Sequence, residues 1–207
     1  MPSGNLKHFV HLHLIVFIWG FTAVIGKLIS LDALPLVWYR MALAMGLVFV
    51  YLKYKKYALK LSLYKVLALL GTGAVIALHW VTFFKAIKVS NVSIALACMS
   101  VGALFAALLE PLWYKRKMIG YEVVFGLLVV LGLGIIFRVE TQYWQGILLA
   151  ISSAFLVAVF SLLNGNFIKT LKPSVIAFYE MAGGVLLLSI YLVFKGSFTS
   201  DFWRISP

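Results

Sequence analysis

The feature that most constrains this chain is a series of apolar blocks, each about as long as a helix that crosses a bilayer. The seven blocks cover roughly residues 9–29, 34–52, 64–84, 89–113, 119–137, 144–167 and 174–194. Hydrophobic residues make up 64% of the 207-residue chain, well above the half that is usual in a soluble domain. Strand-like alternation is absent, so a membrane barrel is not expected. The sequence therefore predicts an all-α polytopic membrane protein with seven transmembrane helices.

Basic residues are spread unevenly over the connections, and this unevenness predicts the orientation. If successive connections alternate between the two sides of the membrane, the side of the N-terminus carries eleven Lys and Arg residues and the other side five. The five are Lys85, Lys88, Arg138, Lys195 and Arg204. Because positively charged connections stay in the cytoplasm, we expect a cytoplasmic N-terminus in a bacterial inner (plasma) membrane. The same distribution accounts for the net charge of +12 without a nucleic-acid partner.

A stretch of the second block returns 140 residues later in the seventh. Residues 38–52 read WYRMALAMGLVFVYL and residues 178–192 read FYEMAGGVLLLSIYL, with six of fifteen positions identical. About one or two identities would be expected by chance, so the match indicates an internal repeat. The two copies are five crossings apart, an odd number, and so run in opposite directions through the membrane. Such inverted repeats are typical of secondary transporters.

The repeat also predicts how the chain divides. Adding 140 to Tyr64, near the start of the third block, gives Arg204. We therefore expect a first five-helix repeat over residues 1–140 and an incomplete second repeat over residues 141–207, short of about three helices. A native seven-helix protein is the alternative interpretation.

Several short patterns resemble the EamA family of the drug/metabolite transporter superfamily over essentially the whole chain. They are Trp19-Gly20-Phe21 followed by Lys27, Pro35 with Arg40, Phe83-Phe84 before Ala86, Glu110 near the end of a small-residue helix, and Gly120, Gly126 and Gly132. The resemblance implies ten helices in two inverted five-helix halves around a central cavity, and transport of small metabolites or drugs, often outward. The chain departs from the pattern by ending after the seventh helix and by lacking the usual proline in the fourth.

Six side chains are predicted to contact a substrate: Trp19, His79, Trp80, Phe83, Ser153 and Asn164. His79 and Phe83 are four residues apart and share a helix face, where a histidine can bind a carboxylate, carry a proton or hydrogen-bond a neighbouring carbonyl. Ser153 and Asn164 lie with Ser161 on one side of the sixth helix, and either line a cavity or join helices. The tryptophans either line the cavity or anchor the protein at the membrane interface.

Three charged residues inside helices are predicted to form gates or ion pairs: Arg40, Glu110 and Glu180. Arg40 and Glu180 occupy equivalent places in the repeat, about 9 Å inside opposite membrane surfaces. A charge at such depth faces protein or water. Glu110 precedes Pro111 and either pairs with Lys115 or carries a proton. Lys27 is expected to extend to the headgroups.

These features favour a secondary transporter that works by alternating access, with proton coupling through His79 or Glu110 left open. The prolines lie near helix ends, so discontinuous helices are not expected. A seven-helix receptor conflicts with the charge distribution, whereas a non-transporting scaffold or a homodimer stays open. An enzyme, a metal site and a cofactor are not expected, since the chain has a single cysteine, Cys98, and no catalytic motif. The substrate class stays open between amino acids, small amphipathic metabolites and aromatic drugs.

The orientation can be tested with reporter fusions. A reporter that is active only in the cytoplasm should be active when fused after residue 57 and inactive when fused after residue 200, because the two positions are separated by five crossings. The opposite pattern, or equal activity at both positions, would contradict the predicted orientation and favour a receptor-like topology.

Overall fold

The chain folds into α-helices. The computed structural model describes residues 6–198 and Phe202, and this part of the chain contains no strands. In chain order the helices are α1 (Leu6–Leu28), α2 (Ala33–Tyr54), α3 (Leu63–Val89), α4 (Val92–Met99), α5 (Gly102–Tyr114), α6 (Gly120–Val139), the 3-10 helix η1 (Thr141–Tyr143), α7 (Trp144–Phe167) and α8 (Pro173–Phe194). The described residues hold seven segments that are long and apolar enough to cross a membrane, with α4 and α5 counted as one segment. The all-α class and the seven spans are thus confirmed, whereas Arg204 lies outside the described residues.

Local chemistry at the helix ends explains the short connections. The side chain of Asn91 accepts a hydrogen bond of 2.9 Å from the backbone nitrogen of Ile94 and so caps the start of α4. Pro173 takes the first position of α8, where its missing N–H is not needed. Lys115 has a φ of 51°, in the left-handed region, and this turns the chain away from α5.

The fourth apolar block differs from the continuous helix that the sequence predicts. It consists of α4 and α5, separated at Ser100 and Val101. The backbone N–H groups of these two residues donate to Ala97 and Cys98, three residues earlier, rather than four. The Ser100 hydroxyl also donates to the Ala97 carbonyl at 2.6 Å. A serine that competes for backbone carbonyls therefore tightens the helix into a 3-10 turn without any proline.

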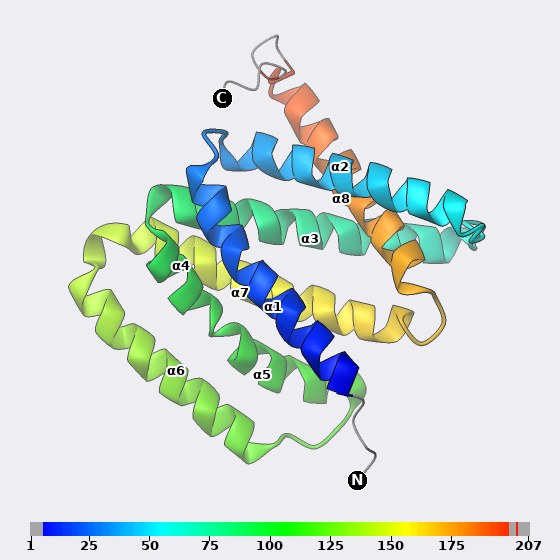
Figure 1. Ribbon diagram of the computed structural model, residues 1–207. Helices are drawn as coiled ribbons and strands as arrows, with labels where there is room; N and C mark the ends of the chain where they lie inside the picture. Colours follow the sequence, from blue (N-terminus) through cyan, green and yellow to red (C-terminus); the bar gives the residue numbers. More distant parts are fainter. Residues whose placement is uncertain (1–5, 199–201, 203–207) are drawn as a thin grey trace.

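Helix α3 lies at the centre of the bundle. It packs most extensively against α7 and α8, and also contacts α1, α2 and α4. Figure 1 shows α2, α3 and α7 crossing the molecule in roughly the same direction, with α8 passing across them at a steep angle. Because α3 is surrounded on several sides, its polar residues Thr72 and His79 are buried.

Two glycines allow α3 and α8 to touch backbone to backbone. A Cβ atom added at Gly73 would lie 2.0 Å from the carbonyl oxygen of Glu180, and one added at Gly183 would lie 2.2 Å from that of Leu70. Either distance is far below van der Waals contact. The crossing of α3 and α8 therefore requires glycine at both positions, as is common where helices pack closely in membranes.

Helices α2 and α8 are in contact and run in opposite chain directions where they cross. Contacts join Trp38 to Ser189 and Phe49 to Phe178, so that residue numbers rise along one helix as they fall along the other. The Tyr39 hydroxyl on α2 donates to the carbonyl of Phe202, beyond the end of α8, at 2.8 Å. The Tyr179 hydroxyl on α8 donates to the carbonyl of Leu59, beyond the end of α2, at 2.6 Å. The two hydrogen bonds are reciprocal, and the two tyrosines are positions that the sequence predicts to be equivalent in a repeat.

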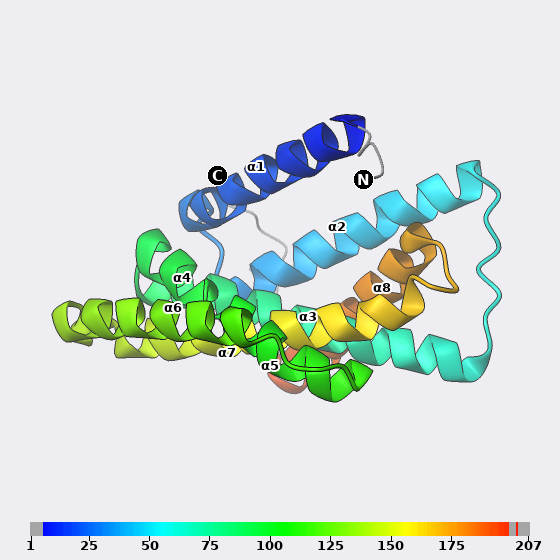
Figure 2. The same ribbon diagram turned by 90° about the horizontal axis from the view of Figure 1, so that it is seen from below.

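Helix α1 stands at the edge of the bundle. Figure 2 shows it apart from α6 and α7, and most of its large apolar side chains are exposed. Two lysines tie its end to α3: Lys27 donates to the carbonyl of Ile87 at 3.1 Å, and Lys88 donates to the carbonyl of Ile29. Each lysine thus satisfies a carbonyl at the end of the other helix. Lys27 is therefore held by α3 instead of extending to the headgroups.

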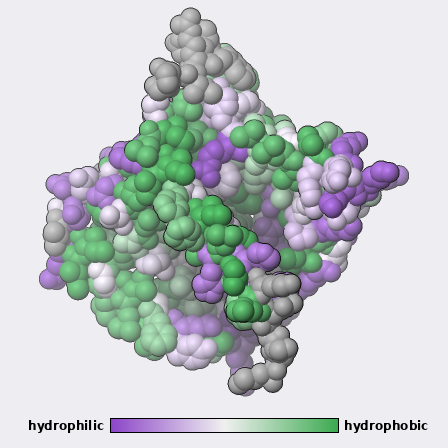
Figure 3. Space-filling view, in the orientation of Figure 1, coloured by the Kyte–Doolittle hydropathy of each residue, from purple (hydrophilic) through white to green (hydrophobic). Residues whose placement is uncertain are grey.

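The surface agrees with a membrane location for these helices. Figure 3 shows hydrophobic side chains over the middle of the visible face and hydrophilic ones at the right-hand end, where the connection between α2 and α3 lies. Helices α1 and α6 each bury only 11% of their most apolar window inside the protein, so most of their surface is available to lipid.

The close crossing of α3 and α8 generates a stability prediction. Gly73→Ala should lower the free energy of unfolding by about 1–3 kcal/mol, because the added methyl group overpacks the crossing. The matched control is Gly71→Ala, since a Cβ at Gly71 meets nothing within 4 Å. Thermal unfolding of the two purified variants in detergent measures the difference. Equal melting temperatures would contradict the close approach.

Candidate functional site

His79 and Ser153 form a buried polar contact between α3 and α7. Ser153 is fully buried and His79 is 8% exposed. The Ser153 hydroxyl donates to the backbone carbonyl of His79 at 2.9 Å, and the Ser153 carbonyl lies 3.0 Å from Nδ1 of His79. Because a carbonyl oxygen can only accept, we assign the ring proton to Nδ1. Nε2 is then the acceptor nitrogen of the neutral ring.

Aromatic rings lie around His79. The Phe83 ring is stacked with the imidazole at a centroid distance of 6.2 Å, and the Phe160 ring lies at 5.5 Å. The structure thus brings together three predicted residues, His79, Phe83 and Ser153. Phe160 was missed by the sequence analysis, although its spacing of seven residues from Ser153 places both on one face of α7.

The ring of Trp80 contacts the guanidinium group of Arg40. The Arg40 Cζ atom lies 5.0 Å from the centroid of the Trp80 ring and 4.8 Å from that of Phe84. Such cation–π contacts compensate a charge without a carboxylate. The ion pairs recorded among the described residues are those of Arg116, so Arg40 is held by the aromatic rings of α3 and not by an ion pair.

Glu180 of α8 and Asn164 of α7 are neighbours in the interior of the bundle. Glu180, on α8, is 5% exposed, and Asn164 of α7 is the side-chain neighbour of its carboxyl group. Two buried oxygens lack a hydrogen-bond partner: Oε1 of Glu180 and Oδ1 of Asn164. The sequence analysis gave these residues separate roles, in a gate and in a substrate site, but the structure places them together.

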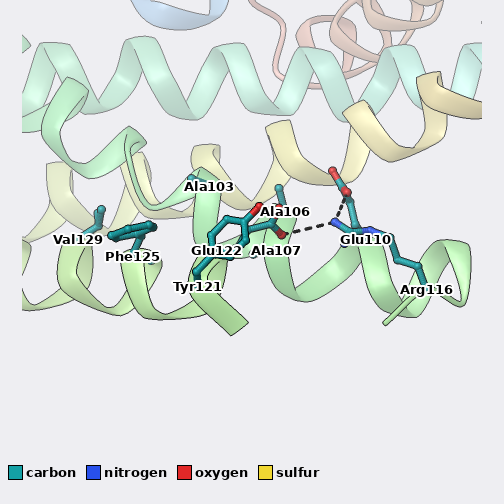
Figure 4. A pocket seen from close by; sticks show the side chains of 10 residues that line it. Ala103, Ala106, Ala107, Glu110, Arg116, Tyr121, Glu122, Phe125 and Val129 are labelled. Carbon is teal, nitrogen blue, oxygen red and sulfur yellow. Dashed lines mark hydrogen bonds and ion pairs between the residues drawn. The ribbon is translucent and has the colours of Figure 1, made fainter. Parts of the chain in front are cut away.

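A third polar group lies in a groove between α5 and α6. The groove has a volume of about 400 Å³ and is lined by Glu110, Arg116 and Glu122 together with small and aromatic side chains (Figure 4). Nη2 of Arg116 lies 2.6 Å from Oε2 of Glu110 and 3.5 Å from Oε2 of Glu122. The hydrogen bond with Glu110 raises the pKa of Arg116, so that this cation is held firmly charged.

The partner of Glu110 differs from the one that the sequence predicts. Lys115 takes the left-handed conformation that ends α5, so the next residue, Arg116, turns back to the carboxylate. Glu122 was missed because it lies on the next helix, and no helical spacing relates it to Glu110. The conformation of the connection between α5 and α6 brings the guanidinium group of Arg116 between the carboxylates of Glu110 and Glu122.

A larger groove opens at the other end of the molecule. It has a volume of about 830 Å³ and is lined by residues at the ends of α1, α4 and α6, among them Lys27, Asn91 and Glu140. The sequence analysis did not group these residues, since the three helix ends are far apart in the chain. Their polar groups lie at helix ends, where the spans finish.

Trp19 is not brought to any of these groups. It lies on α1, is 70% exposed and faces away from the bundle. In a membrane this indole would contact lipid.

The described residues contain no group of three or more His, Cys, Asp or Glu side chains that could hold a metal ion. Cys98 is buried in α4 and carries a free thiol.

A bundle of membrane-length helices around a few shielded polar groups defines a polytopic membrane protein. A model of the EamA-like transporter family, in the drug/metabolite transporter superfamily, matches residues 9–138 of the chain. The match covers more than half of the chain, so the protein belongs to this family. No curated protein and no solved structure matches the chain. The chain is therefore an integral membrane protein of a non-enzymatic family, and membership suggests a membrane transporter.

The contact between α3 and α7 can be tested with two neighbouring serines. Ser153→Ala removes the interhelical hydrogen bond to His79 and should lower the free energy of unfolding by about 1 kcal/mol. Ser152→Ala is the matched control, because the exposed Ser152 hydroxyl donates to Leu148 within its own helix. Unfolding in detergent by heat or denaturant gives both values. A control as destabilised as Ser153→Ala would argue against a special role for the buried contact.

Proposed function

We propose that the protein is a secondary transporter of small metabolites or drugs, which works by alternating access between two inverted repeats. The observation that carries the proposal is the reciprocal pair of hydrogen bonds made by Tyr39 and Tyr179. Each tyrosine binds the backbone that follows the other one's helix, as a two-fold relation between α2 and α8 requires. The family supports the same conclusion, since its members are transporters.

In this proposal residues 1–140 form the first five-helix repeat and residues 141–207 belong to the second. The antiparallel packing of α2 on α8 supports the inverted arrangement. The repeats would meet at the crossing of α3 and α8, where glycines let the backbones slide against each other without interlocking side chains. Rocking of one repeat against the other would expose the interior to each side of the membrane in turn.

The proposed substrate site is the interior around His79. Nε2 of His79 offers an acceptor, and the rings of Phe83 and Phe160 offer apolar faces. Of the other predicted residues, Ser153 contacts His79 directly, Trp80 follows it on α3 beside Arg40, and Asn164 lies beside Glu180. Such a lining suits a small amphipathic molecule with a polar head, a class that includes amino acids, amphipathic metabolites and aromatic drugs. Trp19 is left out of the site because it faces away from the bundle.

We further propose a cytoplasmic N-terminus in a bacterial plasma membrane, supported by the basic connections on that side. Arg116, Glu110 and Glu122 then lie at the cytoplasmic end of the bundle. Their bridged arrangement would hold α5 against α6 while the inner side is closed, and would open when the two helices separate. The sequence analysis predicted a gate or an ion pair at Glu110, and this arrangement would combine both roles with Arg116 as the partner.

The experiment is a release assay with the full chain in lipid vesicles. Vesicles loaded with a defined mixture of amino acids, amphipathic metabolites and aromatic cations should lose one class faster than protein-free vesicles, as measured by mass spectrometry. His79→Ala should lower that rate about tenfold, the effect of losing roughly 1.4 kcal/mol of interaction. Ser152→Ala, on the exposed face of α7, should retain it.

Two outcomes would contradict the proposal. Release of no compound class by a correctly folded protein would favour a non-transporting scaffold. Release that is unchanged in His79→Ala would place the substrate elsewhere in the bundle. Size-exclusion profiles of each variant in detergent separate a loss of transport from a loss of folding.

A further inference from the structure

We propose that Glu180 is a proton-binding site, whose carboxyl group carries a proton in the packed arrangement and releases it to water when α8 separates from α3 and α7. The coupling of this proton to substrate movement rests on the proposed transport function. The protonation itself does not, and it can be measured separately.

The first argument is the burial of an unsatisfied acceptor. Glu180 is 5% exposed, and its Oε1 has no hydrogen-bond partner. At Oε1 an ionised carboxylate loses its hydration without gaining a donor, which disfavours the charged form. A protonated carboxyl group in the same place carries no charge and has a donor of its own.

The second argument is the nature of its neighbour. The amide of Asn164 hydrogen-bonds the carboxyl group of Glu180, but its own Oδ1 is buried without a partner, as is Oε1 of Glu180. A proton on the Glu180 carboxyl group would add a donor to this pair. A bound sodium ion would need several more oxygen ligands than these two side chains supply.

The third argument is that cations on the surrounding helices are engaged elsewhere or exposed. On α2, Arg40 lies over Trp80 and Phe84, and Lys53 lies over Phe49. On α3, His79 contacts Ser153, Lys88 donates to Ile29, Lys85 is exposed, and Lys65 lies near the start of the helix.

The tyrosines of α2 and α3 also have other contacts or are exposed. Tyr39 donates to Phe202, Tyr51 contacts Tyr57, and Tyr54 and Tyr64 are exposed. Helix α7 carries no ionisable side chain.

The position of Glu180 links its proton to the packing of the helices. The backbone at Glu180 is the point that Gly73 of α3 touches, so water is excluded there while the crossing is closed. Loss of the proton would favour any arrangement in which water reaches the carboxylate, and proton binding would favour the closed crossing. By linkage, a movement that opens the crossing must weaken proton binding by the same factor.

Infrared spectroscopy of the full chain in detergent tests the site directly. Near neutral pH the wild-type protein should show the carbonyl absorption of a protonated carboxylic acid. Glu180→Gln should abolish this band, and its amide keeps a donor, so the variant should still fold. The matched control Glu140→Gln should retain the band, because Glu140 lies between the spans and accepts a hydrogen bond from Gln142 at 3.3 Å.

Each other result overturns the proposal. A band that persists in Glu180→Gln would belong to another group, and a wild-type spectrum without the band would show an ionised carboxylate. A band that disappears when sodium replaces choline in the buffer would identify a cation site instead of a proton site.

A vesicle experiment separates this inference from the proposed function. A proton gradient should accelerate substrate release by the wild-type protein, and Glu180→Gln should remove this acceleration. Release that the gradient still accelerates in Glu180→Gln would exclude Glu180 as the coupling group. If no protein variant transports any compound but the infrared band depends on Glu180, the transport function fails and the proton site stands.

Discussion

The backbone contact between α3 and α8 is the interaction on which the interior depends. Helix α3 contacts most of the other helices, and α8 reaches it only because Gly73 and Gly183 carry no side chain. In lipid the hydrophobic effect does not drive helices together, so close van der Waals packing of small residues must do so. A side chain at either glycine would push α8 outward and open the interior to lipid. The enclosure of Glu180 follows from this crossing, whereas His79 is enclosed by the packing of α3 against α7.

The polar groups of the interior have three different environments. Arg40 lies against aromatic ring faces, and His79 exchanges hydrogen bonds with Ser153. Glu180, at the position that the sequence pairs with Arg40, has an acceptor oxygen without a partner. If the two positions are equivalent in a repeat, as we propose, the two copies differ in the electrostatics of this one site.

The sequence predicted the spans and the opposite directions of α2 and α8, because span length and the parity of crossings depend on local composition alone. It could not predict that Arg40 lies over Trp80, or that Glu180 meets Asn164, since both contacts depend on the rotation of one helix against another. The sequence did not predict the 3-10 turn at Ser100, because proline was taken as the only residue that would interrupt the helix. Arg116 bridges two carboxylates through a left-handed residue at Lys115, which hydropathy does not reveal.

The 3-10 turn at Ser100 and Val101 determines how far α5 is rotated about the helix axis relative to α4. Each residue of a 3-10 helix advances about 120° and each residue of an α-helix about 100°, so two such residues rotate α5 by about 40° beyond an unbroken helix. This extra rotation determines which side chains of α5 contact α7 and which contact α6. Adding or deleting one residue in the turn would reassign both neighbours and swing Glu110 away from its groove, although the span would keep nearly the same length and hydropathy.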